Sequence, residues 1–80
     1  MRKYNAKNEI REIRCNRCGK ALKIENGIVK EGVFSSENLW SYFSEKDGEI
    51  HTFDLCESCY DELTKNFKIQ PEIQETTELI

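Results

Sequence analysis

The sequence has no long hydrophobic run, because charged or polar residues interrupt every apolar stretch after two or three residues. Nothing in it approaches the ~18 consecutive apolar residues that a membrane-spanning helix needs. The basic beginning, MRKYNAKNEIREIR, is not followed by the apolar segment of a secretory signal. We therefore expect a cytoplasmic protein that does not enter a membrane.

Apolar residues in general are scarce for a chain that must build a core. Of its 80 residues, 38% are hydrophobic and 34% are charged. This composition fits one small domain and leaves no room for a second independent core. A core of this size rarely supplies more than about 3–5 kcal/mol, so such domains usually depend on disulfides or a bound metal. The four cysteines are the candidates for that stabilising role.

The net charge is only −3, but the basic and acidic residues are unevenly distributed along the chain. Residues 1–23 carry eight basic and two acidic side chains, a balance of +6, whereas residues 24–80 carry four basic and thirteen acidic ones, a balance of −9. This layout favours a charged contact surface, or two solvated faces without a partner. We divide the chain into a flexible basic arm over residues 1–12, a cysteine-containing domain over residues 13–67 and an acidic tail over residues 68–80.

The first of two predicted β-hairpins follows the first cysteine pair. Asn26-Gly27 supplies the positive φ angles of a type I′ turn, which would pair Ile24 with Val29. Before the cysteines, Ile10 and Ile13 fit either one helical turn or a short strand, and their spacing does not decide between them.

The second predicted hairpin comes after a polar loop over residues 35–38. Residues 39–44 and 50–55 are rich in strand-forming side chains and flank a turn at Asp47-Gly48. Cross-strand aromatic pairs contribute roughly 0.2–1 kcal/mol each, and we expect them to form the apolar floor of the domain. In this register Trp40 lies opposite Leu55, and Tyr42 lies opposite Phe53.

After residue 54 the period of the apolar residues changes from two to about 3.6, which predicts a helix over about residues 55–67. Asp54 and Glu57 have the spacing of a capping box at its start, and Pro71 prevents the helix from continuing. The apolar face of this helix consists of Leu55, Cys59, Leu63 and Phe67.

The strongest pattern in the chain is a pair of C-x-x-C motifs separated by 37 residues. Zinc prefers four tetrahedral ligands, and each C-x-x-C turn presents two sulfurs on one side of a short loop. Gly19 suits the first turn, where a Cβ would strain the backbone, and the second pair opens a helix whose free N–H groups favour thiolates. We predict one structural Zn²⁺ bound by Cys15, Cys18, Cys56 and Cys59.

The motifs CNRCGK and DLCESCYDEL, over about residues 13–67, resemble the treble-clef zinc fingers. In that family a knuckle, hairpins and a C-x-x-C in the first turn of a helix follow one another, whereas zinc-ribbon proteins place both pairs on glycine-containing knuckles. The resemblance implies a small α+β zinc-binding domain with two β-hairpins and one C-terminal helix around the four-cysteine site. It leaves the function open, because treble clefs serve in ribosomal proteins, transcription factors, nucleases and protein-binding modules. The stretch SYFSEKDGEIHTFDLCESCYDEL is also similar to small uncharacterised zinc-binding proteins of Gram-positive bacteria and their phages.

Three other uses of the four cysteines are open at this point. Two disulfides satisfy the count but suit a secreted chain better than one without a signal. A redox-active C-x-x-C needs a βαβ frame that the sequence does not indicate. An iron site of the rubredoxin type fits CNRCG, but the second pair lacks the matching glycine.

Catalysis has little support in the sequence. His51 is the only histidine and would be redundant beside four thiolates, so we expect a partly exposed structural residue opposite Ser44. No nucleophile motif accompanies it. A site closed by four thiolates also has no open position for a substrate or water. We predict that the protein is not an enzyme.

Two kinds of partner fit the charge pattern. The leading hypothesis is a zinc-stabilised binding module that acts through protein contacts, as a small regulator or inhibitor of a basic partner protein. The alternative is a nucleic-acid-binding zinc finger that uses the basic segment and stacks Tyr4 on a base. A third class is an accessory fold of a zinc-dependent enzyme without activity of its own. The protein hypothesis invokes Glu45, Asp47, Glu49, Asp61 and Glu62, whereas the nucleic-acid hypothesis invokes Arg11, Arg14, Arg17 and Lys20, of which the last three could instead offset the charge of the thiolates.

Overall fold

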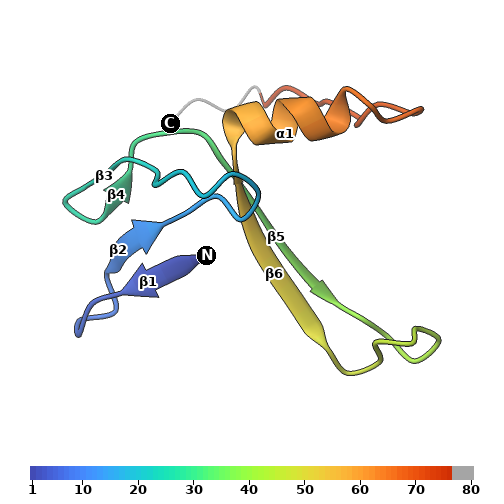
Figure 1. The fold of residues 1–80 in the computed structure, drawn as a ribbon, viewed down its shortest axis with the longest axis horizontal. Helices are drawn as coiled ribbons and strands as arrows, with labels where there is room; N and C mark the ends of the chain where they lie inside the picture. The colour runs from blue at the N-terminus through green and yellow to red at the C-terminus, as the bar shows by residue number, and fades with distance from the viewer. Residues whose placement is uncertain (77–80) are drawn as a thin grey trace.

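The computed structural model describes residues 1–76, which form three two-stranded antiparallel sheets and one helix. The fold class is therefore α+β, with three hairpins where the sequence predicted two (Figure 1). Within these residues, no helix is long and apolar enough to cross a membrane. The elements in order are β1 (Arg2–Tyr4), β2 (Ile10–Ile13), β3 (Ile24–Glu25), β4 (Ile28–Val29), β5 (Val33–Leu39), β6 (Ile50–Cys56) and α1 (Glu57–Thr64).

The segment expected to be a flexible arm is a hairpin, which corrects that prediction. Strands β1 and β2 pair with Arg2 opposite Ile13, and the register shifts between Lys3 and Tyr4. The side-chain oxygen of Asn5 accepts hydrogen bonds from the backbone N–H groups of Lys7 and Glu9 at 2.8 and 3.0 Å, which closes the turn. The turn at Asn5 brings the two polar segments together as a hairpin. Ile10 and Ile13, which fitted either a helical turn or a strand, therefore lie in strand β2.

The hairpin of β3 and β4 has the predicted register, with Ile24 opposite Val29. Asn26 has a φ of 51° and Gly27 a φ of 75°. Two consecutive positive φ angles are what a type I′ turn requires, so the local sequence alone determines this element.

The hairpin of β5 and β6 differs from its prediction in register. Residues 35–38 belong to β5 and are not a loop, so Phe34 lies opposite Leu55 and Ser36 opposite Phe53. Trp40 and Tyr42 therefore lie beyond the strands, in the connection over residues 40–49, and form no floor. His51 lies opposite Asn38, where we expected Ser44. The Asp47-Gly48 pair is not the centre of a two-residue turn, because Gly48 donates its N–H to the Trp40 carbonyl at 3.2 Å within a longer loop.

Helix α1 is shorter than predicted, since it begins at Glu57 and ends at Thr64. Leu55 is still in β6, and Cys56 takes the N-cap position without a side-chain capping bond. The predicted capping box does not form, because the Asp54 carboxylate binds other groups. At the other end, the side-chain amide of Gln70 donates to the carbonyls of Thr64 and Phe67 at 2.9 and 2.8 Å, which satisfies groups that a longer helix would have used. Of the predicted tail, Leu79 and Ile80 lie outside the described residues.

The buried core is small, and half of it consists of cysteine. Partly buried Ile10, Ile24, Val29 and Val33 pack against it. The Cα radius of gyration is 15.3 Å, compared with about 12 Å for a compact domain of this length, because the β5–β6 hairpin extends away from the core (Figure 1). The buried apolar residues are Ile13, Leu22, Leu55, Cys15, Cys56 and Cys59.

Candidate metal centre

The four cysteines meet where the N-terminal half of the chain joins the helix. Cys15 and Cys18 come from the turn after β2, Cys56 ends β6, and Cys59 lies in the first turn of α1. Their four sulfurs all lie within 4.8 Å of one another. Cys18 is exposed and the other three are buried. The structure thus brings together all four predicted ligands.

Backbone hydrogen bonds shape the first pair into a tight knuckle. The Cys15 N–H donates to the Lys20 carbonyl and the Gly19 N–H donates to the Cys15 carbonyl, both at 2.9 Å. The Cys18 N–H points at the Cys15 sulfur at 3.5 Å. Gly19 has a φ of 81°, so its conformation is the one that the sequence led us to expect after the second cysteine.

The sulfur spacing suits a tetrahedral cation and not a disulfide. Two sulfurs that bind one zinc at about 2.3 Å are separated by about 3.8 Å in a tetrahedron. The Cys18 and Cys56 sulfurs are 3.8 Å apart. A disulfide would bring them to about 2.05 Å, and all four cysteines are free thiols. The cluster can therefore hold one metal ion with every tetrahedral position taken by protein sulfur.

Hydrogen-bond donors lower the pKa of two of the thiols, Cys15 and Cys56. Burial raises the pKa of Cys15, but N–H groups of Cys18, Cys56 and Arg17 stabilise its thiolate and lower the pKa to about 6. The Ser58 hydroxyl, 3.5 Å from the Cys56 sulfur, and the Cys59 N–H lower the pKa of Cys56. These donors favour the charged form that a metal requires.

The pKa of Cys59 is shifted in the opposite direction from those of Cys15 and Cys56. The Arg17 guanidinium lowers the pKa of Cys59, but burial and the neighbouring thiols outweigh it and raise the pKa to about 12. The Arg17 guanidinium also donates to the Glu62 carboxylate at 2.6 Å. Without a cation the cluster therefore resists holding four negative charges, and a divalent ion would release the remaining protons.

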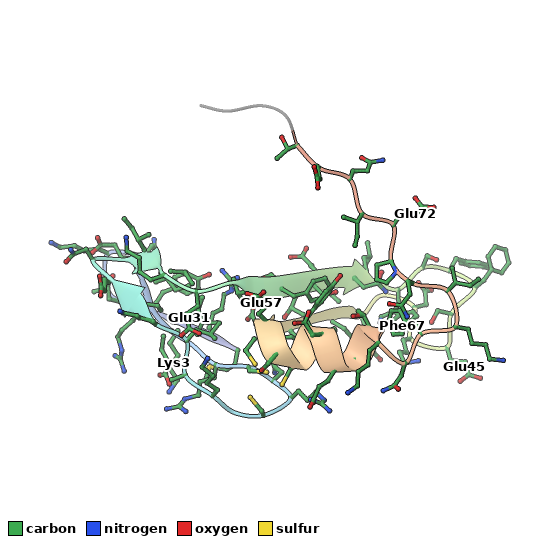
Figure 2. All side chains as sticks on the ribbon, turned by 90° about the horizontal axis from the view of Figure 1, so that it is seen from above. Lys3, Glu31, Glu45, Glu57, Phe67 and Glu72 are labelled. Carbon is green, nitrogen blue, oxygen red and sulfur yellow. The ribbon has the colours of Figure 1, made fainter. Side chains whose placement is uncertain are left out.

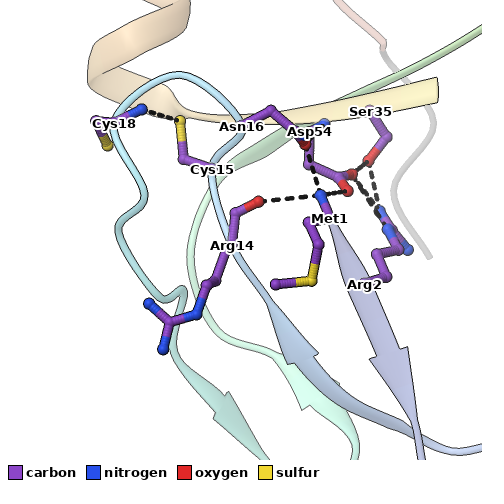
Figure 3. Close-up of polar contacts among 8 residues, drawn as sticks. All are labelled: Met1, Arg2, Arg14, Cys15, Asn16, Cys18, Ser35 and Asp54. Carbon is purple, nitrogen blue, oxygen red and sulfur yellow. Dashed lines mark hydrogen bonds and ion pairs between the residues drawn. The ribbon is translucent and has the colours of Figure 1, made fainter. Parts of the chain in front are cut away.

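Asn16, inside the first C-x-x-C motif, joins the knuckle to the strand that leads to the second motif. Its N–H donates to the Asp54 carbonyl at 2.7 Å, and its side-chain oxygen accepts from the Asp54 N–H at 2.9 Å (Figure 3). This pair of bonds joins the residue after Cys15 to the residue two positions before Cys56. Asn16 was not among the predicted site residues, and a single sequence carries no signal for such a long-range pairing.

The Asp54 carboxylate binds the N-terminal hairpin to the same strand. It accepts from the Met1 ammonium at 2.9 Å, from Arg2 at 3.1 Å and from the Ser35 hydroxyl at 2.7 Å (Figure 3). Burial raises the pKa of Asp54, but these three donors outweigh burial and lower the pKa to about 2. Asp54 is buried, so the ionised carboxylate depends on all of them.

The other residues singled out in the sequence lie around or away from the cysteines. Arg14 donates to the Gly19 carbonyl at 3.0 Å and pairs with Glu12, and Lys20 pairs with Glu31 at 2.8 Å. Tyr4 is exposed on β1 and Arg11 is exposed on β2. His51 contacts Glu49 at 2.9 Å on the β5–β6 hairpin, so it does not join the metal cluster.

The fold and the site together define a small α+β protein with a four-cysteine cluster at metal-binding distance. Comparison with protein-family models, with curated proteins and with solved structures finds no match to this chain. The treble-clef resemblance therefore stays a prediction from the motifs.

Proposed function

We propose that the four cysteines bind one Zn²⁺ and that this ion is structural. The donor set supports zinc, because four thiolates in a tetrahedron are characteristic of closed structural zinc sites. The order of a glycine-containing knuckle, hairpins and a helix that carries the second pair supports a treble-clef arrangement. Free thiols suit a reducing compartment, so we propose that the protein works in the cytoplasm.

We further propose that the protein is a non-enzymatic binding module that acts through protein contacts. The observation that carries this proposal is the internal pairing of its basic residues. A nucleic-acid-binding surface needs cationic side chains free to neutralise phosphates. Most of the basic side chains in residues 1–23 instead contact carboxylates of this chain, namely Arg2 with Asp54, Lys3 and Arg14 with Glu12, Arg17 with Glu62, Lys20 with Glu31, and Lys23 with Glu25.

In the part of the chain that the structure describes, several carboxylates of the acidic segment, residues 24–80, are not paired with basic side chains of this chain. Among the described residues, no ion pair involves Glu45, Asp47 or Asp61, and all three are exposed. Exposed carboxylates steer association with a basic surface. A small regulator or inhibitor that binds a basic protein fits this charge distribution best.

Binding to nucleic acid is the direct test against the alternative. The zinc-loaded protein is titrated at low salt with labelled duplex and single-stranded DNA and with RNA. The matched variant is Lys7→Glu/Arg11→Glu, because these two side chains have no ion pair among the described residues. We expect no binding to nucleic acid by either protein. Binding that weakens steeply with salt and disappears in the variant would establish the nucleic-acid function instead.

A further inference from the structure

The far end of the β5–β6 hairpin exposes large apolar side chains that the fold does not use. We call residues 39–50 the hairpin tip. Phe43 is 97% exposed and Tyr42 is 79% exposed. Leu39 and Ile50, paired across the strands, are also exposed and share one face of the hairpin. Single exposed apolar residues are ordinary, but such a concentration within one projecting element marks an interaction site.

The tip is closed by contacts among its own residues and with His51. Trp40 donates its N–H to the Glu49 carbonyl at 2.9 Å, and Lys46 N–H donates to the Ser44 hydroxyl at 3.0 Å. The Lys46 ammonium lies 4.7 Å from the centre of the Trp40 ring, which in turn meets the His51 ring edge-on at 5.6 Å. A loop that is ordered before binding loses little entropy on association, which favours affinity.

The two most exposed rings form a single unit. The centroids of Tyr42 and Phe43 are 5.2 Å apart, and the planes are at 89°. Aromatic side chains of this kind are typical anchors that fill a pocket at the centre of a protein interface. The buried core is at the other end of the hairpin, so these rings stabilise no part of it.

The charge of the tip selects among partners. It carries Glu45, Asp47 and Glu49 against Lys46 alone, a balance of −2. Glu45 lies at the far end of the molecule from Lys3 and Glu31 (Figure 2). Negative charge around exposed aromatics disfavours the phosphates of nucleic acid and of anionic lipids, and it favours a basic rim.

We infer that the hairpin tip inserts Tyr42 and Phe43 into an apolar pocket that is bordered by lysine or arginine side chains on a partner protein. This inference rests on the proposed function and assigns that function to a specific surface. The basic partner would contact the rings at the centre and the carboxylates of Glu45 and Asp47 at the edge.

Site-specific photo-crosslinking tests the inference. A benzophenone amino acid replaces Phe43 in the full chain, produced in the native host, and the matched control places it at Ile28 on the β3–β4 hairpin, which is also exposed. We expect one protein adduct from position 43 and none from position 28. The adduct is identified by mass spectrometry, and the partner is then purified for binding measurements.

The purified pair gives the quantitative result. Tyr42→Ala/Phe43→Ala and Glu45→Lys/Asp47→Lys should each weaken the affinity at least tenfold, whereas Ile28→Ala should change it less than twofold. Glu49 is left in place to preserve its contact with His51. Circular dichroism and metal content should match the wild type, since the altered side chains are exposed.

Several outcomes would overturn the inference. They are equal binding by the tip variants, no adduct from position 43, a nuclease-sensitive adduct, or an adduct to a second copy of this chain. A partner that crosslinks only from position 28 would show that the hairpin tip is not the binding surface, while the proposed function as a protein-binding module would stand.

Discussion

At the scale of single residues, Asp54 does more for the fold than its place in a strand indicates. A buried carboxylate is costly unless its charge is compensated, and here three donors from two distant segments compensate it. Because the pKa is about 2 in the folded chain against an ordinary value of 3.8, ionised Asp54 stabilises the folded state. That contribution is complete above about pH 4 and is lost as the pH falls toward 2.

Asp54→Asn should therefore lower the free energy of unfolding by about 2 kcal/mol at pH 7. Urea denaturation of the metal-loaded protein measures it, with Asp47→Asn in the exposed loop as the control. A loss below about 0.5 kcal/mol, or the same loss in both variants, would contradict the role given to this carboxylate.

A substitution at Cys18 distinguishes a cluster that binds a metal from one whose cysteines only pack in the core. It is the exposed member of the cluster, so an apolar role predicts almost no effect of Cys18→Ser. A metal-binding role predicts that Cys18→Ser unfolds the domain as fully as Cys15→Ser does, because structural zinc contributes roughly 10–16 kcal/mol in comparable peptides. Circular dichroism and metal content measure the outcome, with Ala21→Ser as the exposed neighbouring control. A folded, metal-loaded Cys18→Ser protein would exclude Cys18 as a ligand.

At the scale of elements, Gly48 in the β5–β6 connection and Gly32 just before β5 should differ in how much stability they lose on replacement by alanine. Gly48 has a φ of 86°, and a Cβ added there would meet no atom within 4 Å, so Gly48→Ala should cost about 1 kcal/mol through the backbone alone. At Gly32 the three atoms nearest to an added Cβ all belong to the Glu57 side chain, and the closest of them is at its flexible end, which can move away. Gly32→Ala should therefore cost less than Gly48→Ala in urea denaturation, and the reverse order would contradict this description.

The elements that could be predicted from the sequence are those whose conformation is local. Asn26-Gly27 determines the β3–β4 hairpin by its own φ angles, and the spacing of the C-x-x-C motifs placed the four cysteines together. The predicted capping box at Asp54 was wrong, because the Asp54 carboxylate binds Met1 and Arg2, more than 50 residues away in the sequence, and does not cap the helix. The same contacts, together with the turn at Asn5, order the N-terminal hairpin, whose polar sequence has no strand periodicity.

The predicted register of β5 and β6 was wrong for a related reason. Asp47-Gly48 resembles a hairpin turn, and the aromatic run around Tyr42 resembles a strand. The observed pairing instead places Ser35 beside Asp54, where its hydroxyl donates to the carboxylate. A contact in three dimensions thus outweighs strand propensity, and it moves the aromatics to the exposed tip.

At the scale of the whole molecule, the charge asymmetry of the sequence is partly cancelled by folding. Basic residues of the first 23 positions face carboxylates from later in the chain, for example Arg17 with Glu62 and Lys20 with Glu31. Among the described residues, Glu45 and Asp47 at the far end of the projecting hairpin are exposed and take part in no ion pair. Three of the six buried apolar residues are cysteines, so little apolar side chain other than cysteine is buried in this core.

The central claim is that a metal bound by the four cysteines stabilises this fold. Elemental analysis of the purified protein, followed by circular dichroism during titration with a chelator, tests it most directly. We predict one zinc per chain and cooperative unfolding as the metal is removed, with refolding when zinc is restored. A metal-free protein that keeps its secondary structure would contradict the account.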